Sequence, residues 1–111
     1  MDRFIAKHLY EILESINAIE SYIEPIATFN DNKNSRQTRR SVEREFEIIA
    51  EALSRILTIE PQFKITSSEL IRGMRNRIIH AYDSIDDAIV YNAVRRHLPE
   101  LKIEIVTLLA T

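Results

Sequence analysis

The chain has 111 residues, of which 45% are hydrophobic and 29% charged, with one Gly and three Pro. This length and usage are typical of one helix-rich globular domain with one modest core and exclude a disordered chain, so we expect a single helical domain over residues 1–111. Lys and Arg total 15 against 17 Asp and Glu, a net charge of -2. This excludes a general attraction to nucleic acid or to an anionic membrane, so any nucleic-acid binding must come from a local patch.

Location and metal chemistry are also restricted by the sequence. No apolar run approaches the roughly twenty residues that span a bilayer, and charges interrupt the start MDRFIAKHLYEIL where a signal peptide is continuously apolar. We therefore expect a cytoplasmic protein with no membrane segment. The chain has no Cys, no HExxH motif and no Gly-rich phosphate loop, so we expect no disulfide, no metal site and no cofactor.

Two long amphipathic helices are predicted by apolar residues that recur at steps of three and four. The first stripe comprises Ile5, Leu9, Ile12, Ile16, Ile19, Ile23 and Ile26, and the second comprises Val42, Phe46, Ile49, Leu53 and Ile56. Pro25 is expected to end or kink the first helix, and the polar residues 29–35 are typical of a loop. The second helix is expected to run to about Glu60, because Pro61 cannot continue it.

Further helices are predicted in the second half of the chain. Thr66 and Glu69 have the spacing of a capping box, which predicts a third helix with the body ELIRGMRNRIIHAY. Ser84 is a predicted start for a short fourth helix to about His97, and Pro99 suits the first turn of a last helix. These elements predict an all-α antiparallel bundle of four to five helices.

The predicted third helix has an unusual outer face. Gly73 lies in its interior, where Gly costs about 1 kcal/mol relative to Ala, and Ile79 lies on the side opposite the predicted core. One interpretation is that a second copy of the helix packs there around a twofold axis, which would bring two sets of Arg75, Asn76 and His80 to one cleft. The other is that Ile79 is one of the many apolar residues found on protein surfaces.

Arg75 and His80 border a groove on this helix, since five residues correspond to a rotation of roughly 140°. Cleavage of RNA by its own 2′-hydroxyl needs a base, an acid and positive charge for the phosphorane, but no metal. Histidine can transfer protons near neutral pH, and Arg matches phosphate oxygens. We therefore predict His80 as the acid-base group and Arg75 as the phosphate clamp. Asn76 would orient the imidazole or contact a phosphate, and Arg72 and Arg77 would guide the RNA backbone.

Each of these residues also has a purely structural interpretation. A lone His in a helical protein is often a surface or interface side chain, and three nearby arginines often form a solvated, ion-paired face. His8 and His97 lack suitable neighbours in the sequence and are expected to be structural.

An acidic row in the second helix is expected to form ion pairs. Glu43, Glu47 and Glu51 follow one another at spacings of four, which places them along one face. The basic residues expected to pair with this row are Arg39, Arg40 and Arg44. The row therefore does not predict a metal site.

Residues 75–82 form an R-x4-H-x-Y motif, which resembles the signature of HEPN domains of the HepT-like toxins. R-x4-H alone is a weak signal, but the tyrosine that follows, the preceding I-x-G-M-R-N run and the segment LPEL make it specific. The resemblance covers almost the whole chain. The segments that carry it, in the family's order and spacing, are LYEILESINAIESYI, SVEREFEIIAEAL, ITSSELIRGMRNRIIHAY and LPELKIEIVTLL.

The resemblance implies an all-α, HEPN-like homodimer with a cleft at the twofold axis lined by Arg75 and His80 of both protomers. It implies the toxin of a bacterial or archaeal toxin-antitoxin pair, a metal-independent endoribonuclease that leaves a cyclic phosphate on its RNA substrate. It also implies a minimal nucleotidyltransferase antitoxin that transfers AMP to Tyr82, which would place anionic groups beside the cleft and repel RNA. Tyr82 can equally be an aromatic at the core margin, and both interpretations can hold.

The sequence departs from the family pattern at a few positions. It has Ala81 where Gly is common, and Asp83 and Ser84 where an aromatic residue and Gly are common, so an acid lies close to the predicted phosphate cleft. Glu45 stands where a neutral polar residue is frequent. An added acid at the cleft would weaken RNA binding.

Three functions are therefore left open by the sequence. The first is a toxin ribonuclease that uses Arg75 and His80. The second is a non-catalytic helical partner that delivers a nucleotide or substrate to a nucleotidyltransferase. The third is a dimeric helical scaffold, for which His80 would be without consequence.

Overall fold

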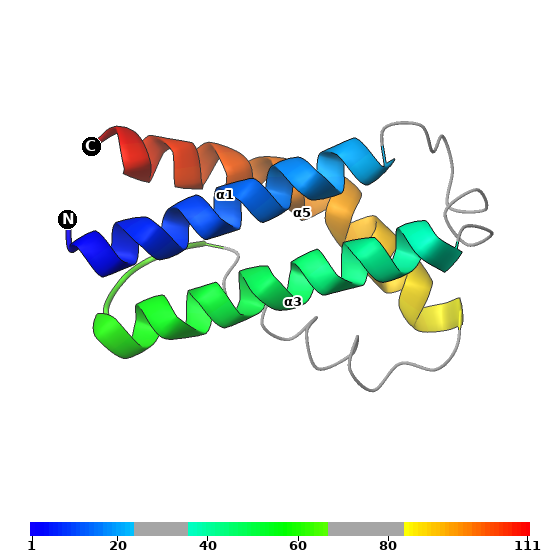
Figure 1. The fold of residues 1–111 in the computed structure, drawn as a ribbon, viewed down its shortest axis with the longest axis horizontal. Coiled ribbons are helices and arrows are strands. Elements are labelled where there is room, and N and C mark those ends of the chain that lie inside the picture. The colour runs from blue at the N-terminus through cyan, green and yellow to red at the C-terminus, as the bar shows by residue number, and fades with distance from the viewer. Residues whose placement is uncertain (24–35, 67–83) are drawn as a thin grey trace.

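A computed structural model of the chain describes residues 1–23, 36–66 and 84–111. Within these ranges every regular element is a helix: α1 (Arg3–Ile23), α3 (Arg36–Ile59) and α5 (Ser84–Ala110) (Figure 1). The prediction of an all-α chain is confirmed for these residues. The third helix predicted from the sequence lies, apart from Thr66, outside the described residues.

The start of α1 is capped by Asp2. Its Oδ1 accepts the backbone N–H groups of Phe4 at 2.7 Å and Ile5 at 3.2 Å, which satisfies two of the amides that a helix start leaves without partners. The helix ends at Ile23, two residues before Pro25, the residue that the sequence predicted to end or kink it. The predicted stripe is buried from Ile5 to Ile19.

Helix α3 begins at Arg36, directly after the polar stretch predicted to be a loop, and ends at Ile59. The Glu60 amide still donates to the Ile56 carbonyl at 2.8 Å, and Pro61 follows. The predicted end of this helix is therefore confirmed to within one residue. All five apolar positions of its stripe are at most 3% exposed.

Helix α5 corrects one prediction. Its start at Ser84 was expected, but a break near Pro99 was not found: α5 continues through Pro99 to Ala110. Proline inside a helix removes one backbone hydrogen bond and costs about 3 kcal/mol or more. Leu98, Leu101 and Ile105 on either side of it are at most 2% exposed, and their burial offsets that cost. Figure 1 shows α5 changing direction along its length, as helices that contain proline commonly do.

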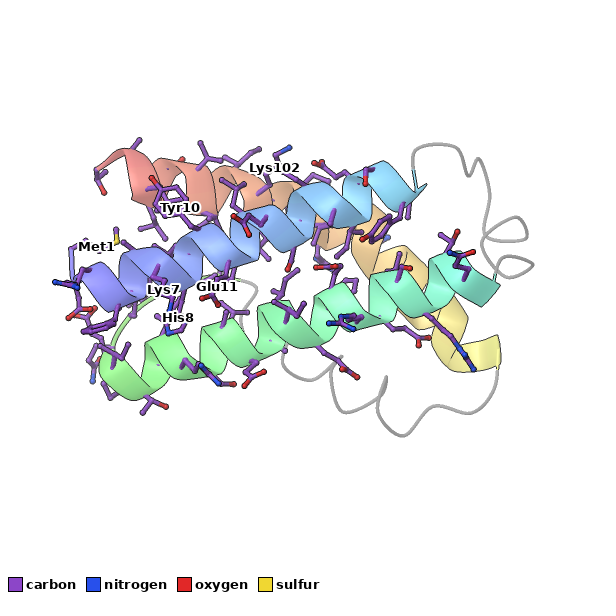
Figure 2. All side chains as sticks on the ribbon, viewed as in Figure 1. Met1, Lys7, His8, Tyr10, Glu11 and Lys102 are labelled. Carbon is purple, nitrogen blue, oxygen red and sulfur yellow. The ribbon has the colours of Figure 1, made fainter. Side chains whose placement is uncertain are left out.

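Helix α1 is the central element. It packs against both α3 and α5, and Figure 1 shows it running in the opposite direction to both, with the two termini at the same end of the molecule. Its apolar stripe meets those of α3 and α5 in one core. At the edge of this core, Lys102 on α5 donates to Glu20 Oε1 on α1 at 2.7 Å (Figure 2). The pair is partly exposed and contributes little beside the buried apolar side chains.

Two isoleucines of α5 test this arrangement. Ile105 is fully buried and Ile103 is 69% exposed. Ile105→Ala is expected to lower the free energy of unfolding by about 2–5 kcal/mol, because it removes buried methyl groups and leaves a cavity. Ile103→Ala should change it by less than about 0.5 kcal/mol. Urea denaturation of both variants measures the difference, and equal effects would contradict this packing of α5.

Candidate functional site

All of the site residues predicted from the sequence lie in the segment 67–83, outside the described residues. They are Arg72, Gly73, Arg75, Asn76, Arg77, Ile79, His80 and Tyr82. Their roles stay predictions. The structure does describe the two ends to which this segment is joined, Thr66 before it and Ser84 after it, and a basic surface on α3.

Thr66 is held against α5 by two hydrogen bonds to one carboxylate. Its backbone N–H donates to Glu104 Oε1 at 2.8 Å and its hydroxyl donates to Glu104 Oε2 at 2.7 Å. The sequence predicted Glu69 as the acceptor for this amide, in a capping box. The structure shows Glu104 of α5 accepting it, and Glu69 lies outside the described residues. Sequence spacing could not identify Glu104, because it lies 38 residues further along the chain.

Both ends of the predicted catalytic segment are attached to α5, one by the hydrogen bonds of Thr66 and the other by the continuous chain at Ser84. Thr66 binds Glu104 in the second half of α5, and residue 84, at the other end, is the first residue of α5. The predicted catalytic segment therefore joins α5 at two places along its length, through Thr66 and through Ser84.

An open hollow of about 570 Å³ lies on the first half of α3. The described residues that line it are Gln37, Arg40, Ser41 and Arg44. They follow the spacing i, i+3, i+4 and i+7, so they share one face of the helix. Ser41 is half-buried and the other three are exposed. All four described lining residues have polar or charged side chains, and two of them are positively charged.

One member of the acidic row of α3 pairs with an arginine that was not among those predicted. Glu51 pairs with Arg55, one turn further along, at 2.8 Å. Arg40 and Arg44, which were expected to pair with the acidic row, form no ion pair within the described ranges. Their spacing with Gln37 and Ser41 was available in the sequence. The nearby acids, however, led us to expect ion pairs there, so a basic surface was not predicted.

The structure places His8 as a structural histidine, as expected. It is 9% exposed, and its Nδ1 lies 3.4 Å from Oε2 of Glu11, one turn along α1; Figure 2 shows the two side chains at the same end of that helix.

Histidine and acidic side chains form no group of three that could hold a metal ion in the ranges described. None of α1, α3 and α5 is both long and apolar enough to cross a bilayer.

Comparison with known proteins assigns the chain to a class. Residues 12–108 match the family described as Ribonuclease HepT-like. The chain therefore belongs to the HepT-like ribonuclease family, and its enzyme class is ribonuclease. The resemblance predicted from the R-x4-H-x-Y motif is confirmed.

Archaeal relatives agree with this assignment. A Methanocaldococcus jannaschii protein provisionally named as an RNase is 33% identical over 106 residues, which cover 93% of this chain and 94% of that protein. A Thermococcus cleftensis protein provisionally named ribonuclease HepT is 33% identical over 106 residues, covering 92% and 93% of the two chains. No solved structure matches the chain.

The attachment of Thr66 can be tested by removing its acceptor. Glu104→Ala should speed hydrogen exchange of the Thr66 amide and lower the free energy of unfolding by about 1–2 kcal/mol, since two bonds to a partly exposed carboxylate are lost. Glu100→Ala, one turn earlier on α5 and exposed, is the matched control and should change neither quantity. Unchanged exchange at Thr66 in Glu104→Ala would contradict the attachment.

Proposed function

We propose that this chain is the toxin of a toxin-antitoxin pair, a metal-independent endoribonuclease that acts in the cytoplasm as a homodimer of single-domain subunits. The observation that carries this proposal is the family match over residues 12–108. That range includes the complete R-x4-H-x-Y motif at Arg75, His80 and Tyr82. The four- to five-helix bundle and the twofold cleft are parts of the same proposal.

The proposed reaction is attack by the 2′-hydroxyl oxygen on the adjacent phosphorus. The imidazole of His80 in one protomer accepts the hydroxyl proton, the bond from phosphorus to the 5′-oxygen breaks, and the imidazolium of the other protomer gives that oxygen a proton. The products are a 2′,3′-cyclic phosphate and a 5′-hydroxyl. Arg75 stabilises the charge that accumulates on the phosphorane, because its guanidinium offers paired donors to two phosphate oxygens.

The neighbouring residues have supporting roles in this proposal. Asn76 is one turn from His80 in the predicted helix, where its amide orients the imidazole or binds a phosphate oxygen. Arg72 and Arg77 follow the RNA backbone. Asp83 adds a negative charge that opposes them, so we expect weaker RNA binding than in relatives that have an aromatic residue there.

The proposed partner is a minimal nucleotidyltransferase antitoxin. It would transfer AMP from ATP to the Tyr82 hydroxyl, with release of pyrophosphate, and leave a charged phosphodiester beside the cleft. A fixed negative charge there repels the RNA phosphates. This modification would switch off cleavage without unfolding the toxin.

His80→Ala is expected to abolish cleavage of RNA by the purified protein in the presence of a chelator, because no other described or predicted group can transfer both protons. The melting temperature should change little. His97→Gln, a half-buried histidine on α5, is the control and should keep its activity. Retained cleavage by His80→Ala would exclude this mechanism, and no cleavage by the unmodified, partner-free protein would favour the non-catalytic delivery function.

The dimer has its own test. Ile79→Asp should convert the dimer to a monomer in analytical ultracentrifugation and lower cleavage in parallel, since a buried carboxylate at the predicted interface lacks a partner. Ile103→Asp places the same charge on an exposed position of α5 and should leave the dimer intact. If Ile103→Asp dissociated the dimer and Ile79→Asp left it intact, the dimer contact would instead lie on α5.

A further inference from the structure

We propose that the hollow on α3 is a second RNA-binding surface, in which Arg40 and Arg44 hold phosphates of the substrate strand outside the R-x4-H-x-Y motif. Gln37 and Ser41 complete its described lining. This proposal rests on the proposed ribonuclease function for the identity of the ligand. It adds residues of α3 that neither the motif nor the family match assigns.

The spacing of the two arginines suits a phosphate backbone. Four residues of helix advance by about 6 Å, so the two guanidinium groups are presented side by side to neighbouring phosphates of one strand. Each offers a planar set of donors that matches phosphate oxygens. The Gln37 amide and the Ser41 hydroxyl add neutral donors to the same face.

The local charge also favours an anion. The chain has a net charge of -2, yet residues 36–44 contain four arginines and one acid. The first turn of α3 has no acidic residue, and the partial positive charge of a helix start adds to that of the side chains. Since Arg40 and Arg44 form no ion pair within the described ranges, their charges are available to a ligand.

The hollow lies at the end of the molecule to which the predicted catalytic segment is joined. Figure 1 shows the start of α3 (cyan) and the start of α5 (yellow) at the end opposite the two termini. Ser84, the first residue of α5, follows His80 by four residues. Four extended residues reach at most about 14 Å, so chain continuity keeps the predicted acid-base group within that distance of the start of α5.

The lining favours RNA over a protein ligand. Protein interfaces are centred on aromatic and other apolar anchors, and the described lining has none. Contacts from Arg and from neutral polar side chains to a phosphate backbone are instead typical of nucleic-acid binding that does not depend on sequence. The surface would position a strand and would not select its bases.

The test is salt-dependent RNA binding in a His80→Ala background, which prevents cleavage. Fluorescence anisotropy with a labelled single-stranded RNA gives the dissociation constant between 50 and 300 mM salt, about the range over which phosphate contacts weaken. The double variant R40A/R44A should bind about tenfold more weakly at the lowest salt. Its plot of log affinity against log salt should be shallower by about 1.4, because each contact to a single strand contributes about 0.7.

Two matched variants distinguish an effect of this surface from a general effect of losing positive charge. R55A removes an exposed arginine of the same helix that is paired with Glu51, and it should leave the salt slope unchanged. R40K/R44K keeps both charges and should keep the slope. Because Arg40 and Arg44 are exposed, the double alanine variant should melt at the temperature of its parent. If its melting temperature is lower, the single variant R44Q is used in place of the double variant. The expected change in the salt slope is then half as large.

An R40A/R44A slope equal to that of R55A would overturn the proposal, as would the absence of measurable RNA binding by the parent. It would also be overturned if R40A/R44A kept its RNA binding and lost only the complex with the proposed nucleotidyltransferase partner, because the surface would then bind a protein. Failure of the ribonuclease function itself is seen separately, as intact RNA after incubation with the unmodified chain, and leaves the binding result interpretable.

Discussion

Burial of the apolar stripe of α1 between α3 and α5 is the interaction on which the rest of the structure depends. Ile12, Ile16 and Ile19 are fully buried, and they contact a core to which all three described helices contribute. Each such side chain contributes about 1.5–3 kcal/mol, more than the partly exposed Lys102 to Glu20 pair can. The directions of α3 and α5 follow from this packing, and so do the positions of Thr66 and Ser84, which flank the predicted catalytic segment.

Helix α5 connects the core to the segment that carries the predicted catalytic motif. Its buried residues keep it helical through Pro99, its Glu104 holds Thr66, and its first residue directly follows the segment that carries the R-x4-H-x-Y motif. A catalytic group needs to be held to within a fraction of an ångström, and residues attached to rigid helices are held better than residues of free loops. Both ends of the predicted catalytic segment are attached to α5, which is itself anchored in the core.

An acidic ribonuclease must concentrate its positive charge. The net charge of -2 gives the molecule no long-range attraction for RNA, so binding depends on where the arginines lie. The predicted motif supplies Arg72, Arg75 and Arg77, and the first half of α3 supplies Arg40 and Arg44. Glu51, further along the same helix, pairs with Arg55, and residues 36–44 at its start contain four arginines and one acid.

The sequence by itself determined the helical class, the buried stripes of α1 and α3, the end of α3 before Pro61, the start of α5 at Ser84 and the ribonuclease family. These features follow from local periodicity, from prolines and from a short motif, all of which are visible along the chain. Only the tertiary structure decided that α5 continues through Pro99, that Glu104 takes the amide predicted for Glu69, and that Arg40 and Arg44 stay free of the nearby acids in the described ranges. Each of these features depends on a contact between residues far apart in the sequence, or on which of several nearby residues an acid pairs with. Neither can be read from the spacing of residues along the chain.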